Sequence, residues 1–261
     1  MGEASCSGRR SAGPIIVRNR SEHSARAKPT VVLWDMDDTI FDHALTSRAA
    51  LALARRRYPA LRGPTLDELW QEYGRLLGIT HIEVMLGRRT SHDARIDRFR
   101  RLAAWAGHRV SADEARTMST DYRDWYLRAR RPVAGAPEAV RYLHRTARIG
   151  VVTNNTVAEQ VEKIAFLGLK ESIDVLVTSE EVGVGKPDPE IFRVALERTG
   201  AKPRDAVMIG DSWASDIAGA RAAGIRAVWF NRFRLPAPAG TDVAELRSFR
   251  SPAGVARLLT G

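Results

Sequence analysis

The sequence predicts an α/β protein in which a doubly wound parallel sheet, of the Rossmann-like kind, carries an inserted all-helical domain. Short apolar runs rich in Val, Ile and Leu alternate with helical patterns, and such near-continuous runs are typical of strands covered on both faces. A segment of about 105 residues separates the first run from the second, whereas a crossover connection needs only about 12. We expect strands at 30–34, 148–152, 174–178, 205–209 and 225–230.

The composition is that of a globular protein with a sizeable core. The chain has 261 residues, of which 44% are hydrophobic and 28% charged. No run approaches the roughly 20 apolar residues of a membrane span, and no apolar stretch near the start resembles a signal-peptide core. We therefore expect a cytoplasmic protein without membrane contact. The single cysteine, Cys6, excludes an intramolecular disulfide and argues against thiol catalysis.

The net charge of +10 is unevenly distributed. Residues 1–28 carry six basic and two acidic side chains, and residues 43–131 carry eighteen basic and ten acidic side chains. Residues 1–29 show no sustained periodicity, so we expect a disordered basic leader there. A basic surface can attract nucleic acid, but it equally attracts small phosphorylated substrates, and an arginine-rich surface can also be merely solvated.

Residues 43–131 are predicted to form a helical cap. Apolar residues recur at helical spacing over four stretches, and a fifth helix at 136–146 leads back to the sheet. Because this insertion leaves the sheet just after the first strand, we expect it to lie over the strand ends as a lid. The predicted domains are a core of 30–42 and 132–261 and a cap of 43–131. The cap helices are expected at 45–57, 65–77, 92–106 and 111–130.

Three further helices are expected between the later strands. Thr156 and Glu159 form a capping-box pattern that opens a helix ending at Gly168. Asp188 and Pro189 read as N-cap and first residue of a second helix, which runs to about residue 200. A short alanine-rich helix is expected at 216–224.

Polar and charged residues follow four of the predicted strands. In parallel sheets ligands bind at the carboxyl ends of the strands, so we expect these residues to form one site. The first strand ends in three acids, whose mutual repulsion calls for a cation, a proton or water. The residues are Asp35, Asp37, Asp38 and Thr39 after the first strand, Thr153, Asn154 and Asn155 after the second, Lys186 after the third, and Asp211 with Asp216 after the fourth.

This combination of groups suits phosphoryl transfer. Asp35, Asp37 and Asp211 offer hard oxygen ligands of the kind that Mg²⁺ prefers. The helix that begins near Asn155 offers unpaired N–H groups to a phosphate, and Lys186 offers a positive charge. One carboxylate can attack phosphorus, while another protonates the leaving oxygen and later activates water.

Four motifs resemble those of the haloacid dehalogenase-like hydrolase superfamily. They are DMDDT, VVTNN, GKPDPEIF and GDSWASD, which stand in the family's order over about residues 30–230. The resemblance implies that Asp35 is the nucleophile and Asp37 the general acid and base. It further implies that Thr153 and Lys186 are catalytic groups that hold the substrate phosphate.

The resemblance also implies a Mg²⁺ site and a supporting acid. Asp35 and Asp211 would bind the ion through side chains, and the position of Asp37 would bind it through its main-chain carbonyl. Asn154 belongs to the expected phosphate site. Asp216 is expected to stand behind the metal ligands or to pair with Lys186.

Each assignment has a simpler alternative. Asp38 can cap the turn, Asp216 can be a first-turn helix acid favoured by the helix dipole, and Lys186 can be a solvated loop lysine. In the cap, a cationic stretch could contact a second anionic or sugar group of the substrate, or could be a solvated helix face. That stretch contains His81, Arg88, Arg89, His92 and Arg95.

The predicted function is hydrolysis of a small phosphorylated metabolite, a nucleotide or sugar phosphate, by a magnesium-dependent phosphatase that forms an aspartyl-phosphate. The segment IRAVWFNR resembles pyrimidine nucleotidases and N-acylneuraminate phosphatases of the superfamily. A sugar-phosphate mutase is the nearest alternative, and the family's true dehalogenases lack the acid/base carboxylate that Asp37 supplies. A non-catalytic nucleic-acid-binding module is disfavoured because all expected catalytic positions are filled. We expect a monomer or homodimer.

Overall fold

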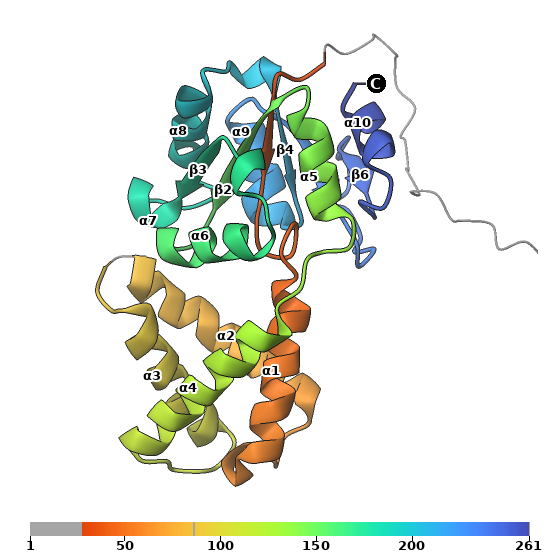
Figure 1. Ribbon diagram of the computed structural model, residues 1–261. Helices are drawn as coiled ribbons and strands as arrows, with labels where there is room; N and C mark the ends of the chain where they lie inside the picture. Colours follow the sequence, from red (N-terminus) through yellow and green to blue (C-terminus); the bar gives the residue numbers. More distant parts are fainter. Residues whose placement is uncertain (1–27, 86, 261) are drawn as a thin grey trace, which may run out of the picture.

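A six-stranded parallel sheet forms the centre of the larger domain. The computed structural model describes residues 28–85 and 87–260, so nearly all of the predicted disordered leader lies outside the described residues. The strand order is β3-β2-β1-β4-β5-β6, with β1 in the middle (Figure 1). The strands are β1 (Val31–Trp34), β2 (Arg148–Thr153), β3 (Val175–Thr178), β4 (Ala206–Gly210), β5 (Arg226–Phe230) and β6 (Ala244–Leu246).

Helices cover both faces of this sheet, so the doubly wound α/β prediction is confirmed. Val31 and Leu33 of β1 pack with Phe192 on the face covered by α8 (Pro189–Thr199) and α9 (Ala218–Ala222). Val32 and Trp34 belong to the core on the other face, which α5 and α10 cover. The remaining bounds in this domain are α5 (Ala136–His144), α6 (Val157–Phe166), α7 (Ser179–Val182) and α10 (Pro252–Thr260).

The start signals for α6 and α8 are present, but the capping box expected at α6 is only half formed, because the Thr156 amide donates to Asn155 Oδ1 and not to Glu159. Thr156 caps α6 by accepting a hydrogen bond from the Glu159 amide, and Asp188 caps α8 by accepting one from the Glu190 amide. α8 ends at Gly200, whose φ of 66° lies in the left-handed region that glycine adopts without strain.

The prediction of a helix at 216–224 is wrong at its start. Ser212 caps a π-helix, Trp213–Ile217, by accepting a hydrogen bond from the Ser215 amide, and α9 continues from it. Asp216 therefore lies inside the helical segment and points back at Gly210. A Cβ on Gly210 would stand 2.5 Å from the Cβ and Cγ of Asp216, so only glycine permits this approach.

In the described residues, four α-helices and a short 3-10 helix (Pro59–Leu61) form the smaller, inserted domain, which we call the cap. They pack around an aromatic cluster in which the ring of Tyr122 lies 5.1 Å from that of Tyr73 and 5.2 Å from that of Phe99. Ser111 and Glu114 form a reciprocal capping box at the start of the fourth helix. The cap helices are α1 (His43–Arg57), α2 (Leu66–Met85), α3 (Ser91–Trp105) and α4 (Ala112–Ala129).

Two adjacent chain crossings join the cap to the sheet domain. The Asp42 amide donates to the Arg131 carbonyl at 3.1 Å, and the Val133 amide donates to the Ile40 carbonyl at 2.8 Å. Since Asp42 also caps α1, the cap begins directly at this crossing and faces the carboxyl edge of the sheet (Figure 1). We propose these crossings as the domain boundaries, with 43–131 as the cap between core segments 30–42 and 132–261.

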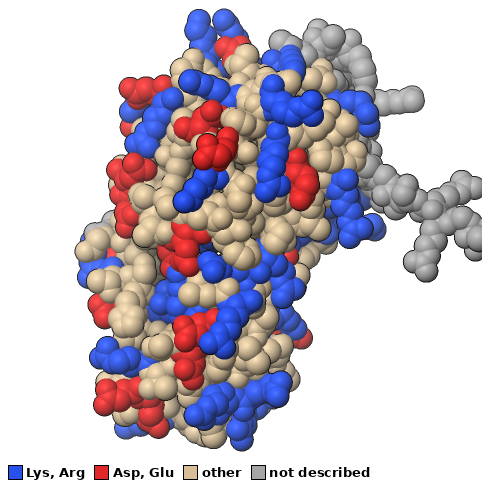
Figure 2. All heavy atoms as spheres, viewed as in Figure 1, with Lys and Arg blue, Asp and Glu red and all other residues tan. Residues whose placement is uncertain are grey.

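The visible surface carries charges of both signs. Figure 2 shows basic side chains over both the sheet domain and the cap, with acidic side chains between them. No helix in the described ranges has the length and apolarity that crossing a membrane requires.

Candidate active site

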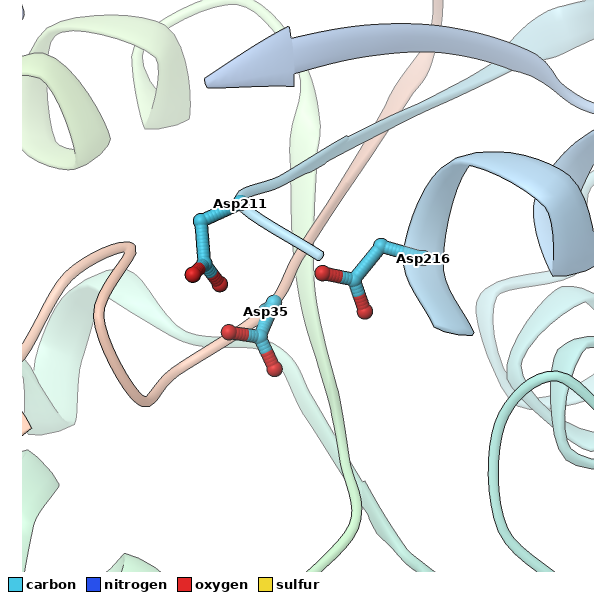
Figure 3. A group of neighbouring side chains, drawn as sticks. All are labelled: Asp35, Asp211 and Asp216. Atoms are coloured by element: carbon cyan, nitrogen blue, oxygen red, sulfur yellow. The ribbon is translucent and has the colours of Figure 1, made fainter. Parts of the chain in front are cut away.

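Three carboxylates meet at the carboxyl edge of the two central strands. Asp35 follows β1 and Asp211 follows β4, and the Asp35 amide donates to the Ile209 carbonyl of that neighbouring strand at 2.9 Å. Asp216 reaches the same place from the π-helix. One oxygen from each of the three lies within 4.8 Å of the others, and their carboxylates point toward one another (Figure 3).

Lys186 is buried among these acids. Its Nζ donates to Asp35 Oδ1 at 2.6 Å and to the Val152 carbonyl at 2.7 Å, and lies 2.7 Å from Asp216 Oδ1. Its exposed fraction is 5%, so the alternative of a solvated loop lysine is wrong. The expected Asp216–Lys186 ion pair is present.

Asn154 positions the Lys186 segment through both ends of its side-chain amide. The Lys186 amide donates to Asn154 Oδ1 at 2.6 Å, and Asn154 Nδ2 donates to the Lys186 carbonyl at 2.8 Å. Gly185 allows this contact, because a Cβ there would stand 2.7 Å from Asn154 Oδ1. The side chain of Asn154, expected in the phosphate site, thus orients Lys186. Thr153 ends β2 and is buried at the same edge of the sheet.

Burial and mutual repulsion change the acidity of this group. Burial raises the pKa of Asp35 to about 7, with Lys186 opposing the rise and Asp216 adding to it. Burial raises the pKa of Asp211 to about 8, and the charges of Asp35 and Asp216 add to the rise. Lys186 can balance only one of the three negative charges. Carboxylate oxygens with an excess of negative charge are the donor set that Mg²⁺ prefers, so these residues fit the expected ion.

The side chain of Asp37 lies apart from these three carboxylates and faces the cap. Lys163 Nζ donates to its two oxygens at 2.6 and 2.8 Å, and Gln160 Nε2 and Asn155 Nδ2 donate to Oδ2 at 3.1 and 3.2 Å. Burial alone would raise the pKa of Asp37, but Lys163 and His43 outweigh it and hold the pKa well below the usual range. The side-chain oxygens of Asp37 are thus committed to α6. Any part that Asp37 takes in metal binding would fall to its main-chain carbonyl.

Sequence reasoning missed Lys163, although the helix containing it was predicted. Gln160, Lys163 and Ile164 of α6 are all buried, which shows that this face turns inward. A glutamine and a lysine in line with apolar residues were the available signal. Polar side chains on an inward helix face need partners, and here the partner is Asp37.

Asp38 performs the turn-capping role that the sequence left open. Its φ of 63° lies in the left-handed region, which aspartate tolerates better than most residues. Its Oδ1 accepts from the Ala44 amide at 2.8 Å and from Arg232 Nη2 at 2.8 Å. Arg232 also pairs with Asp42 at 3.0 Å, so one arginine ties the start of the cap to the loop after β5.

A cavity of about 370 Å³ lies between the cap and the sheet domain. Asp37, Lys163 and Asn155 line its floor on the side of the sheet domain. From the cap, His81 lines the cavity and places its Nε2 2.9 Å from the Asn154 carbonyl oxygen. Of the cationic stretch singled out in the sequence, His81 and Arg95 line the cavity. Arg89 instead pairs with Glu83 and Asp97. The cavity is also lined by Tyr73, Arg98, Arg123 and Glu159.

Comparison with known sequences agrees with the motif order. Residues 29–224 match the family model described as haloacid dehalogenase-like hydrolase. A phosphoserine phosphatase from Thermus thermophilus is 32% identical over 228 residues, which cover 77% of this chain and 88% of that protein. The pyrimidine 5′-nucleotidase YjjG of Escherichia coli is 40% identical over 110 residues, which cover 42% of this chain and 49% of that protein.

Solved structures with the same fold include two of similar extent. The HAD-hydrolase YfnB from Bacillus subtilis, bound to magnesium, matches with a TM-score of 0.70 and 22% identity over 90% of this chain and 100% of that one. A 2-haloacid dehalogenase from Pseudomonas syringae matches with a TM-score of 0.60 and 27% identity, covering 88% and 99% of the two chains. The family model spans well over half of the sequence, and the fold agrees with it. The chain belongs to the haloacid dehalogenase-like hydrolase family.

Proposed function

We propose that the protein is a magnesium-dependent phosphomonoesterase that hydrolyses a small phosphorylated metabolite through an aspartyl-phosphate on Asp35. The observation that carries this proposal is the cluster of Asp35, Asp211 and Asp216 at the carboxyl edge of the central strands, where Lys186 pairs with Asp35 and Asp216. Relatives named phosphoserine phosphatase, pyrimidine 5′-nucleotidase and glyceraldehyde 3-phosphate phosphatase support it.

We assign the role of nucleophile to Asp35. Its Oδ1 accepts from Lys186, whereas within the described part of the chain Oδ2 has no hydrogen-bond partner. Oδ2 would attack phosphorus as the bond to the leaving oxygen breaks. Lys186 and the hydroxyl group of Thr153 would hold the phosphate oxygens. The unpaired N–H groups expected at the start of α6 are engaged, because the Thr156 amide donates to Asn155 Oδ1 and the Val157 amide donates to Glu180 Oε2.

We assign the role of general acid and base to Asp37. It would donate a proton to the leaving oxygen in the first step. In the second it would take a proton from the water that attacks the aspartyl-phosphate, which releases phosphate and restores Asp35. The ionised carboxylate of Asp37, which Lys163 stabilises, can accept a proton and therefore suits the second step. A substrate that enters from the cavity would separate Asp37 from Lys163, and the pKa of Asp37 would rise toward that of a proton donor.

Asp35, Asp211 and the main-chain carbonyl of Asp37 would hold Mg²⁺, which when bound offsets the charge of the carboxylates and the phosphate. Asp216 would contribute by keeping Lys186 charged and in place, since its carboxylate also accepts from the Ser212 amide at 2.9 Å. The magnesium in the YfnB structure supports this choice of ion.

The test is phosphate release from a panel of nucleotides, sugar phosphates and other phosphorylated small metabolites, with Mg²⁺ and with a chelator. The proposal requires release that depends on Mg²⁺ and is lost in Asp35→Asn. Release that survives the chelator would contradict the metal requirement. Chloride release from L-2-chloropropionate without phosphatase activity would replace the proposal with dehalogenation. Turnover that depends on a bisphosphate activator would indicate a mutase.

A further inference from the structure

One buried arginine of the cavity wall lacks a counter-ion in the described residues. Arg98, on α3, is 6% exposed and lines the cavity whose floor includes Asp37. No carboxylate in the ranges 28–85 and 87–260 lies within ion-pair distance of its guanidinium. A buried charge without a counter-ion carries a large desolvation penalty, so its retention needs a reason.

The other cations of the cavity wall are paired. Arg95 lies 3.5 Å from Glu159, and Arg123 contacts the same glutamate at 3.3 Å. Lys163 pairs with Asp37. Arg123 also pairs with Glu162 at 2.6 Å. Among the arginines and the lysine that line the cavity, Arg98 is therefore the one without a carboxylate partner in the described residues.

Neutral hydroxyl groups hold the guanidinium of Arg98 in one orientation. Nε and Nη2 donate to Thr80 Oγ1 at 3.2 and 3.0 Å, and Nη1 donates to Tyr73 Oη at 2.9 Å. Thr80 can accept these bonds because its own proton goes to the Leu76 carbonyl at 2.9 Å. The ring of Tyr73 lies 5.1 Å from the guanidinium carbon. Three of the five guanidinium N–H groups are used in this way, which leaves one on each terminal nitrogen.

We propose that Arg98 binds a second anionic group of the substrate, a carboxylate or a second phosphate, while the scissile phosphoester lies at Asp35. This inference rests on the proposed function and narrows its substrate class to doubly anionic metabolites. Two N–H groups on separate terminal nitrogens suit the paired oxygens of such an anion. The cavity is continuous from Asp37 to Arg98, and its volume suits a small ligand.

The first test compares matched esters on the wild-type enzyme. The pairs are O-phosphoserine with O-phosphoethanolamine, 3-phosphoglycerate with glycerol 3-phosphate, and glucose 1,6-bisphosphate with glucose 6-phosphate. In each pair only the first member carries the second anion. We expect kcat/KM to favour the doubly anionic member of at least one pair by about 10- to 100-fold, the range of a charge-assisted hydrogen-bonded contact. Equal rates within all three pairs would overturn the inference. A preference in the first two pairs would identify the anion bound by Arg98 as a carboxylate, and a preference in the third pair would identify it as a second phosphate.

The second test removes the charge. Arg98→Met should lower kcat/KM for the preferred doubly anionic ester by a similar factor, mainly through KM, and should leave the singly anionic ester nearly unchanged. Arg98→Lys keeps the positive charge but loses the paired N–H groups of the guanidinium, so it should retain part of the preference for the doubly anionic ester. This variant still tests the inference if Arg98→Met does not fold. Arg100→Met is the matched control, because Arg100 lies on the same helix and its side chain is 62% exposed. Equal losses for both esters would mean a purely structural role and would overturn the inference.

A binding measurement separates this inference from the proposed function. Titration calorimetry with O-phosphoserine, 3-phosphoglycerate and glucose 1,6-bisphosphate in Mg²⁺ reports Arg98 without turnover when the wild type and Arg98→Met are both given the additional change Asp35→Asn. If no ester is hydrolysed but at least one of these compounds binds and Arg98→Met weakens its binding, the phosphatase proposal fails and the anion site stands. If at least one ester is hydrolysed and the wild type and Arg98→Met bind all three compounds equally, the anion site fails and the phosphatase stands. Failure of all three compounds to bind the wild type would also overturn the anion site.

Discussion

Replacing Lys163 by methionine should destabilise the fold by about 2 kcal/mol at pH 7. The Lys163 side chain is 5% exposed and contacts both oxygens of Asp37, whose side chain is 26% exposed. An exposed pair contributes about 0–1 kcal/mol, and breaking a fully buried pair costs about 3–5. Because the Asp37 side chain is about one quarter exposed, the cost of Lys163→Met should lie between these limits. Gln160 and Asn155 retain their hydrogen bonds to Asp37 and moderate the loss.

The destabilisation should shrink as the pH falls from 7 toward 4. In the wild type the pKa of folded Asp37 lies below its unfolded value of 3.8, so Asp37 stabilises the fold above that pH and loses this effect as pH falls through the folded pKa. Without Lys163, burial dominates and should raise the folded pKa above the unfolded value. The variant then carries a penalty at neutral pH that fades once Asp37 is protonated in the folded state.

Urea unfolding of both proteins at several pH values between 7 and 4 measures this difference. Lys202→Met serves as the control, since Lys202 is exposed and its removal should change the free energy of unfolding by less than about 0.5 kcal/mol. A Lys163→Met effect below about 0.5 kcal/mol at pH 7, or one that does not vary with pH, would refute the claim that Lys163 holds Asp37 ionised.

Three further changes test the nucleophile, the N-terminal leader and the close contact at Gly210. Asp35→Asn should abolish magnesium-dependent phosphate release with an unchanged circular dichroism spectrum, and residual turnover at wild-type rates would exclude Asp35 as the nucleophile. Deleting residues 1–28 should leave kcat/KM for a small substrate nearly unaltered, whereas a large loss would make the leader part of the site. Gly210→Ala should cost about 1–3 kcal/mol in urea unfolding, because the new methyl group collides with Asp216. Gly63→Ala, with nothing within 4 Å, should change stability by less than about 0.5 kcal/mol, and equal effects would contradict the steric argument.

Much of the fold could be predicted because the signals are local. The strand containing Val32 and Trp34 reads as a continuous apolar run, and the helix after Asp188 carries its own start and stop signals. The strand β6 and the helix α10 were missed. β6 has three residues, which is too short for any periodicity, and it belongs to the sheet only through its pairing with β5.

The site could be predicted in outline because strand ends in a parallel sheet meet at one edge. Its fine structure depends on contacts between residues far apart in the chain. The pairing of Asp37 with Lys163 spans 126 residues, and no sequence pattern links the two positions. The orientation of Arg98 depends on Thr80 and Tyr73 in another helix of the cap, so its role follows only from the packed structure.

Trapping the phosphorylated enzyme tests most directly whether Asp35 forms an aspartyl-phosphate. The protein is mixed with Mg²⁺ and a substrate identified from the panel, quenched in acid, digested and analysed by fragmentation mass spectrometry. We predict that the peptide spanning residues 31–42 gains one phosphoryl group and that fragmentation assigns it to Asp35, with no such label in Asp35→Asn. Phosphate release without any labelled peptide, or a label on Asp37 or on a residue outside this peptide, would show that Asp35 is not the nucleophile.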